Sequence, residues 1–171
     1  MEPISYEQFK TMFASSHRAW HLEMRDVYRV EAEDLPFAKW LKGEHDDFKW
    51  FQEWLDHIRE MTREGVKIER LRIVTEPHTD YIRWEASLSP RNIEAGEEIR
   101  YLTRQAVADI PLPAEDCWLF DDDRLVLSLF KPDGRSGGFA VEGDPALVDQ
   151  YRRVRDLTWS RATPYEFYTT E

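Results

Sequence analysis

The stretch Glu115–Gly134, EDCWLFDDDRLVLSLFKPDG, contains two apolar runs joined by three consecutive aspartates. The runs CWLF and RLVLSLFK have the length and the aromatic and β-branched content of strands. Aspartate favours turns, and the Pro-Asp-Gly order in KPDGR suits a type I turn followed by a left-handed glycine. Together with GGFAVEG, which follows that turn, the stretch predicts a meander of three strands.

The aspartate triplet, Asp121, Asp122 and Asp123, can be interpreted as a cation site or as a turn. A calcium site needs roughly six oxygen ligands, and a calcium loop alternates its acids and ends in a Glu about eleven positions on. The triplet shows neither feature. Three adjacent acids on a short connection cannot all point inward, so we interpret them as a turn and predict no metal site.

The residues before the meander alternate helical and strand patterns. Apolar spacing predicts a short helix from Ile4 to Phe13, and alternation predicts a strand within 18–30. Helices are expected over 33–43 and 45–65, a strand over 66–77, and a helix from His78 that Pro90 should end or kink. A strand over 98–105 then leads to the meander. A last helix is capped by Asp144, with Pro145 at its first position.

This element order, β-α-β-α-β-β-β-β-α, predicts an α/β or α+β fold with a mixed β-sheet flanked by helices. A length of 171 residues fits a single domain over 1–171.

Composition narrows the classes of function. The formal net charge of -11 argues against strong direct nucleic-acid binding, which needs concentrated positive charge. Cys117 is the single cysteine, so no intramolecular disulfide can form, which fits a reducing cytoplasm. No apolar run is long enough to span a bilayer, so we expect no membrane insertion. The sequence contains neither a phosphate-binding loop nor a helical zinc pair, so we expect no cofactor.

Charged residues on strands that should be buried give the best candidate site. Arg70 and Arg72 share one face of a predicted strand, and Arg100 lies on a neighbouring one. Buried arginines need partners, which predicts either a structural ion-pair network or a pocket for an anionic or polar ligand. The carboxylates considered as partners are those of Glu23, Glu76, Glu97 and Asp121. The candidate ligand-binding residues are Glu23, Arg70, Arg72, Arg83, Arg100, Trp118 and Asp121.

Four segments carry a resemblance to a known family: HLEMRDVY from His21, RLRIVTEPHTDYIRWE from Arg70, AGEEIRYLTR from Ala95 and DCWLFDDDRLVLSLF from Asp116. They resemble a family of small acidic actinobacterial proteins, abundant in streptomycetes, that carry a domain of unknown function. Members are often encoded beside helix-turn-helix regulators. The resemblance implies a regulatory or signalling accessory and assigns no active site.

A more remote resemblance is to one half of the phospholipase D fold, which carries its catalytic His-x-Lys-x4-Asp motif on a strand near this position. Aligned on Asp116, the motif positions hold Asp116, Trp118 and Asp123. The histidine and the lysine are absent, and covalent phosphoryl chemistry needs the imidazole. This resemblance therefore implies a catalytically inactive copy.

We therefore predict a non-enzymatic regulatory or interaction protein that acts with a protein partner, such as a helix-turn-helix DNA-binding regulator, or as a homodimer. The alternative is a small-molecule sensor for an anionic ligand, or an enzyme, that uses the cluster of Arg, Asp and Glu side chains. A concave pocket lined by convergent polar groups would favour the alternative, whereas a flat aromatic surface would favour the partner.

Overall fold

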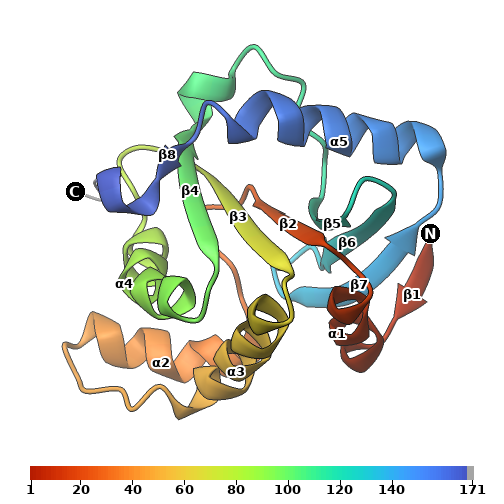
Figure 1. Ribbon diagram of the computed structural model, residues 1–171. Coiled ribbons are helices and arrows are strands. Elements are labelled where there is room, and N and C mark those ends of the chain that lie inside the picture. Colours follow the sequence, from red (N-terminus) through yellow and green to blue (C-terminus); the bar gives the residue numbers. More distant parts are fainter. Residues whose placement is uncertain (169–171) are drawn as a thin grey trace.

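A mixed sheet of eight strands organises the computed structural model, which describes residues 1–168. The strands are β1 (Glu2–Ile4), β2 (Arg18–Glu23), β3 (Lys67–Val74), β4 (Glu98–Thr103), β5 (Asp116–Phe120), β6 (Arg124–Phe130), β7 (Ser136–Glu142) and β8 (Thr163–Pro164). Their order across the sheet is β1-β7-β6-β5-β2-β3-β4-β8 (Figure 1). The pairs β2–β3 and β3–β4 are parallel and the remaining pairs are antiparallel. The predicted α/β class with a mixed sheet is confirmed.

Helices cover both faces of this sheet. They are α1 (Tyr6–Ala14), α2 (Glu31–Leu41), α3 (Lys49–Arg63), α4 (Asp80–Glu94) and α5 (Pro145–Trp159), with short 3-10 helices η1 (Arg104–Val107) and η2 (Tyr165–Phe167). Figure 1 shows α5 on one face and α1, α2, α3 and α4 on the other. In the described part of the chain, no helix combines the length and the apolar composition needed to cross a bilayer.

The two faces differ because strand side chains alternate between them. Under α5, Leu22 and Leu71 belong to one continuous apolar core. The opposite face carries two separate apolar clusters, one with Phe9 and Ile58 from α1 and α3, the other with Trp84 from α4. The side chains of β2 and β3 that lie between those clusters are polar. They are His21, Glu23, Arg70 and Arg72.

Local signals in the sequence are largely matched by the structure. Asp121–Asp123 form the turn between β5 and β6, and Gly134 has the expected left-handed conformation with φ 84°. Thr79 caps α4, and Asp144 caps α5.

The structure departs from two local expectations. Pro90 was expected to end or kink its helix, and it does not end it: α4 continues to Glu94, with Leu88, Ser89 and Asn92 buried. Tertiary packing there outweighs the lost backbone hydrogen bond. Ile4 lies in β1 and not in the first helix. The edge strands β1 and β8 have three and two residues, too few to leave a periodic pattern in the sequence.

Candidate functional site

A concave site lies over the polar part of the sheet, between the two apolar clusters. It consists of two adjoining pockets with volumes of about 450 and 470 Å³. Small-molecule sites usually have volumes of about 300–1,000 Å³. The residues that line both pockets are Tyr6, His21, Val30, Glu33, Arg70, Glu85, Trp118 and Phe139. We refer to the two pockets together as the central pocket.

Two arginines, each held between two carboxylates, form the floor of the central pocket. Arg70 places Nη1 2.5 Å from Glu23 Oε1 and Nε 2.5 Å from Glu97 Oε1. Arg72 places Nη2 2.5 Å from Glu85 Oε2 and Nε 3.3 Å from Glu23 Oε2. Glu23 therefore bridges the two guanidinium groups. The floor is a connected ion-pair network that also borders a cavity. An ion-pair network and a ligand pocket, the two interpretations of these arginines, therefore do not exclude each other.

Burial and the two arginines together shift the pKa values of Glu23 and His21. Burial raises the pKa of Glu23, but Arg70 and Arg72 together outweigh burial and lower that pKa to about 2. Burial also lowers the pKa of His21 to about 3, and the two arginines act in the same direction. Near neutral pH, Glu23 is therefore ionised and His21 is uncharged.

A second group of acids lies beside the floor, around Tyr81. The Tyr81 hydroxyl lies 2.5 Å from Glu33 Oε2 and 3.3 Å from Glu85 Oε1. A phenol has one proton, so it can donate to only one of these carboxylates at a time. Burial, followed by the charge of Glu85, raises the pKa of Glu33 to about 8.

Asp116 resembles Glu33 in its environment. Burial raises the pKa of Asp116 to about 7, although the Tyr28 hydroxyl donates a hydrogen bond to this carboxyl. Asp116 Oδ1 also accepts the backbone N–H of Met24 at 3.0 Å. Glu33 and Asp116 thus give the central pocket two carboxyl groups that titrate near neutral pH.

Aromatic rings form most of the remaining wall. Trp118 stacks on His21 with ring centroids 4.1 Å apart, and Phe9 stacks on Phe139 at 4.3 Å. Trp50 and the rest of the α3 aromatics close one side. The aromatic residues on this side of the pocket are Tyr6, Phe9, Trp50, Phe51, Trp54, Trp118 and Phe139. Such rings contact apolar groups through their faces and attract cations.

The structure brings together four of the seven residues proposed from the sequence. Glu23, Arg70, Arg72 and Trp118 line the central pocket. Glu97, considered as a partner, pairs with Arg70, whereas Glu76 accepts a hydrogen bond from the Tyr168 hydroxyl.

Three candidates lie elsewhere, which corrects the proposed set. Arg83 is on the outer surface of α4, 3.0 Å from Asp80. Arg100 is on the α5 face of the sheet, where it pairs with Glu98 and stacks on the ring of Trp159, because strand alternation turns it away from Arg72. Asp121, in the β5–β6 turn, accepts the backbone N–H groups of His17 and Arg18 at the start of β2.

Sequence reasoning missed several pocket residues. Glu85 had a signal, because it is a charged residue on the inner stripe of a helix that also presents Tyr81 and Leu88. Glu33 and Asp116 had none, since their neighbours come from distant parts of the chain. Within residues 1–168, no three His, Cys, Asp or Glu side chains are arranged to hold a metal ion.

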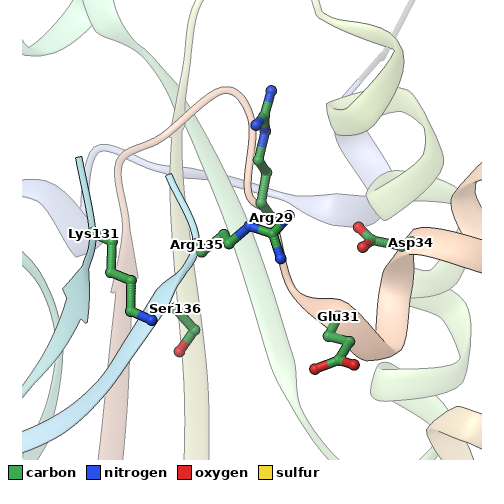
Figure 2. Close-up of a pocket in the computed structure, with 6 residues that line it drawn as sticks. All are labelled: Arg29, Glu31, Asp34, Lys131, Arg135 and Ser136. Carbon is green, nitrogen blue, oxygen red and sulfur yellow. The ribbon is translucent and has the colours of Figure 1, made fainter. Parts of the chain in front are cut away.

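A smaller outer pocket of about 220 Å³ adjoins the central pocket through Ser136, which lines both. Figure 2 shows its basic side chains, Arg29, Lys131 and Arg135, together with the acids Glu31 and Asp34. All of these side chains are exposed, and exposed charges interact only weakly in water. We assign this outer pocket to the rim of the site.

Comparison with protein-family models identifies the family of this chain. The model of a domain of unknown function, DUF6879, matches residues 7–170. The chain belongs to the DUF6879 family. The match runs from α1 to beyond η2, so every residue of the pocket floor lies inside the DUF6879 domain. Membership of a family with a domain of unknown function was predicted from the four sequence segments. No curated protein matches the sequence.

Proposed function

We propose that this protein binds a small organic molecule in the central pocket. One observation carries the proposal: charged side chains from β2, β3 and α4 converge on the floor of a concave, aromatic-walled site. Buried ion pairs are a poor source of stability, because well-packed apolar residues of similar volume often stabilise a fold equally well or better. A connected set of charges beside an open volume is more typical of a binding site.

The proposal changes the expected class of ligand. The alternative predicted from the sequence was a pocket in which arginine side chains bind an anionic or polar ligand, but Arg70 and Arg72 each already contact two carboxylates. An anion would have to displace Glu23 or Glu85 or lie beside their negative charge. Binding through the arginines alone is therefore not part of the proposal.

A reaction is the second candidate function. Glu33 and Asp116, with pKa values raised to about 8 and about 7 mainly by burial, have the properties of general acids or bases near neutral pH. Conversion of a bound molecule during prolonged incubation, lost in Glu33→Gln, would favour an enzyme over a binding protein.

The remaining expectations stay proposals. They are that relatives are actinobacterial and encoded beside helix-turn-helix regulators, that such a regulator or a second copy of this chain is a partner, and that the protein acts in the cytoplasm. A ligand-binding protein is compatible with them, because occupancy of the pocket could change the affinity for a partner. The likeness to phospholipase D adds no support to any of these proposals.

Thermal shifts with a library of water-soluble amines, carboxylates and nucleosides test the binding proposal. Ala32 is exposed on α2 and lines the central pocket, so Ala32→Trp should block it while the core stays intact. Ala146→Trp, at an exposed position of α5 on the other face, is the matched control. Ligands should raise the melting temperature of the wild type and of the control, but not of Ala32→Trp. Shifts that persist in Ala32→Trp would contradict the proposed site.

A further inference from the structure

We infer that the ligand of the central pocket is an organic cation, a protonated amine with an apolar body, whose ammonium group lies against Glu33 and Glu85. This inference rests on the proposed function and adds the chemical class of the ligand. Three independent features of the pocket support it: the balance of its charges, the pairing of its arginines and the surfaces of its tryptophans.

The first feature is an excess of carboxyl groups. The pocket and its floor contain five, from Glu23, Glu33, Glu85, Glu97 and Asp116, against two guanidinium groups, from Arg70 and Arg72. His21 adds no charge near neutral pH, because burial lowers its pKa to about 3. An unmatched charge is costly away from water. Near neutral pH Glu33 is mostly protonated, because burial raises its pKa to about 8, but the three floor carboxylates of Glu23, Glu85 and Glu97 still exceed the two guanidinium groups by one. The charge that this site lacks is therefore positive.

The second feature is the place in the pocket where a positive charge is missing. Arg70 and Arg72 form ion pairs with Glu23, Glu85 and Glu97 at the floor. Glu33 lies outside this network, where its described polar partner is the Tyr81 hydroxyl. Because the same hydroxyl is within reach of Glu85, the two carboxylates lie close together at the edge of the pocket. An ammonium group can donate to both at once, which the single phenolic proton cannot do.

The third feature is the aromatic wall. Trp50, Trp54 and Trp118 line the pocket, and in residues 1–168 no Lys or Arg side chain stacks over their rings. Indole faces attract cations more strongly than other aromatic rings do, and they also contact apolar groups. The wall therefore suits a molecule that presents an apolar body and a positive charge together.

Matched probes that share one phenyl ring test the charge class. They are 2-phenylethylamine, 2-phenylethanol and 3-phenylpropionate, which are respectively cationic, neutral and anionic at neutral pH. Affinities are measured through tryptophan fluorescence and confirmed by thermal shift. We expect the amine to bind about tenfold more tightly than the alcohol, because a hydrogen bond to a charged group adds to the shared ring contact. The propionate should bind most weakly.

Glu33→Gln tests the position of the ammonium group. The amide is isosteric with the protonated acid and should preserve folding, which a melting curve verifies. It should bring the amine affinity close to that of the alcohol and leave the alcohol affinity unchanged. Glu60→Gln, at an exposed position of α3 that lines neither the central nor the outer pocket, should change neither.

Other outcomes separate the two proposals. Equal or tighter binding of the propionate would overturn the cationic ligand and leave the binding proposal standing. An undiminished preference for the amine in Glu33→Gln would overturn its placement at Glu33. If none of the three probes bound at millimolar concentration, the proposed function itself would fail.

Discussion

Arg72 and Glu85 join the middle of the sheet to α4 through an Nη2–Oε2 contact of 2.5 Å between two side chains that are almost fully buried. Removing one member leaves the other charge unpaired in a medium of low dielectric. We therefore expect Arg72→Ala to lower the free energy of unfolding by about 3–5 kcal/mol. Urea denaturation followed by circular dichroism measures this change.

Arg83→Ala is the control for that measurement. Arg83 also pairs with an acid on α4, Asp80, but the two side chains are 37% and 64% exposed. Exposed pairs contribute little, so the expected loss is below about 1 kcal/mol. An Arg72→Ala variant as stable as the wild type would show that water solvates the floor of the pocket.

Stability should fall as the pH rises from 6.5 to 8.5. Burial is the main cause that raises the pKa of Glu33 to about 8 and that of Asp116 to about 7. The folded state then holds protons that the unfolded chain has released, so the stabilisation is complete below the ordinary carboxyl pKa and disappears as the pH passes the folded pKa. His21 acts in the opposite direction, because burial lowers its pKa to about 3 and the unfolded chain therefore binds a proton that the folded state does not. Its contribution to stability rises with pH and is complete above the ordinary histidine pKa of about 6.5.

Glu33→Gln should remove roughly 1–2 kcal/mol of this fall in stability between pH 6.5 and 8.5. Glu31→Gln should leave the slope unchanged, since Glu31 is exposed. Chemical denaturation at several pH values compares the variants. Parallel slopes in the wild type and in Glu33→Gln would show that Glu33 is already ionised in the folded protein.

Asp121 should contribute more to stability than the exposed Asp123 of the same aspartate triplet. Its Oδ1 accepts the backbone N–H groups of His17 and Arg18, and its φ is 53°. Asp121→Ala should cost about 1–3 kcal/mol, whereas Asp121→Asn, which keeps an acceptor and tolerates left-handed backbone, should cost much less. Asp123→Ala, at an exposed position, is the control in a thermal melt. Equal losses in the alanine variants would contradict this role.

Cys117 should report opening of the fold. The thiol is fully buried, and burial is the main cause that raises its pKa well above the ordinary value. A thiol reagent should therefore modify Cys117 slowly in buffer and rapidly in denaturant, because the thiolate is the reactive form. A ligand that stabilises the folded state should slow the reaction further. Rapid modification of the native protein would show that β5 is accessible without unfolding.

Local patterns made much of the fold predictable. The alternation in β2 and β3 correctly separated Leu71 and Ile73 from Arg70 and Arg72, because successive strand residues point to opposite faces. Turn chemistry located the β5–β6 connection, and the Asp144 cap located the start of α5. Each of these signals depends on residues within a few positions of one another.

The candidate site was only partly predictable. The need to neutralise Arg70 and Arg72 pointed to Glu23 and Glu97, but Arg100 and Asp121 were grouped with them wrongly. Membership of one sheet does not fix the face on which a side chain lies. That depends on the register between β3 and β4, in which Leu71 and not Arg72 is opposite Arg100.

The sequence by itself determined the longer strands, β2 to β7, and most helices, the turn at the aspartate triplet and the presence of charges that needed buried partners. Only the tertiary structure decided that α2 and α4 bring Glu33 and Glu85 to the same phenol, and that apolar clusters on either side leave a cavity above the arginines. The physical reason is distance along the chain. Periodicity and turn chemistry are local, whereas a pocket and the pKa values inside it depend on which remote segments exclude water together.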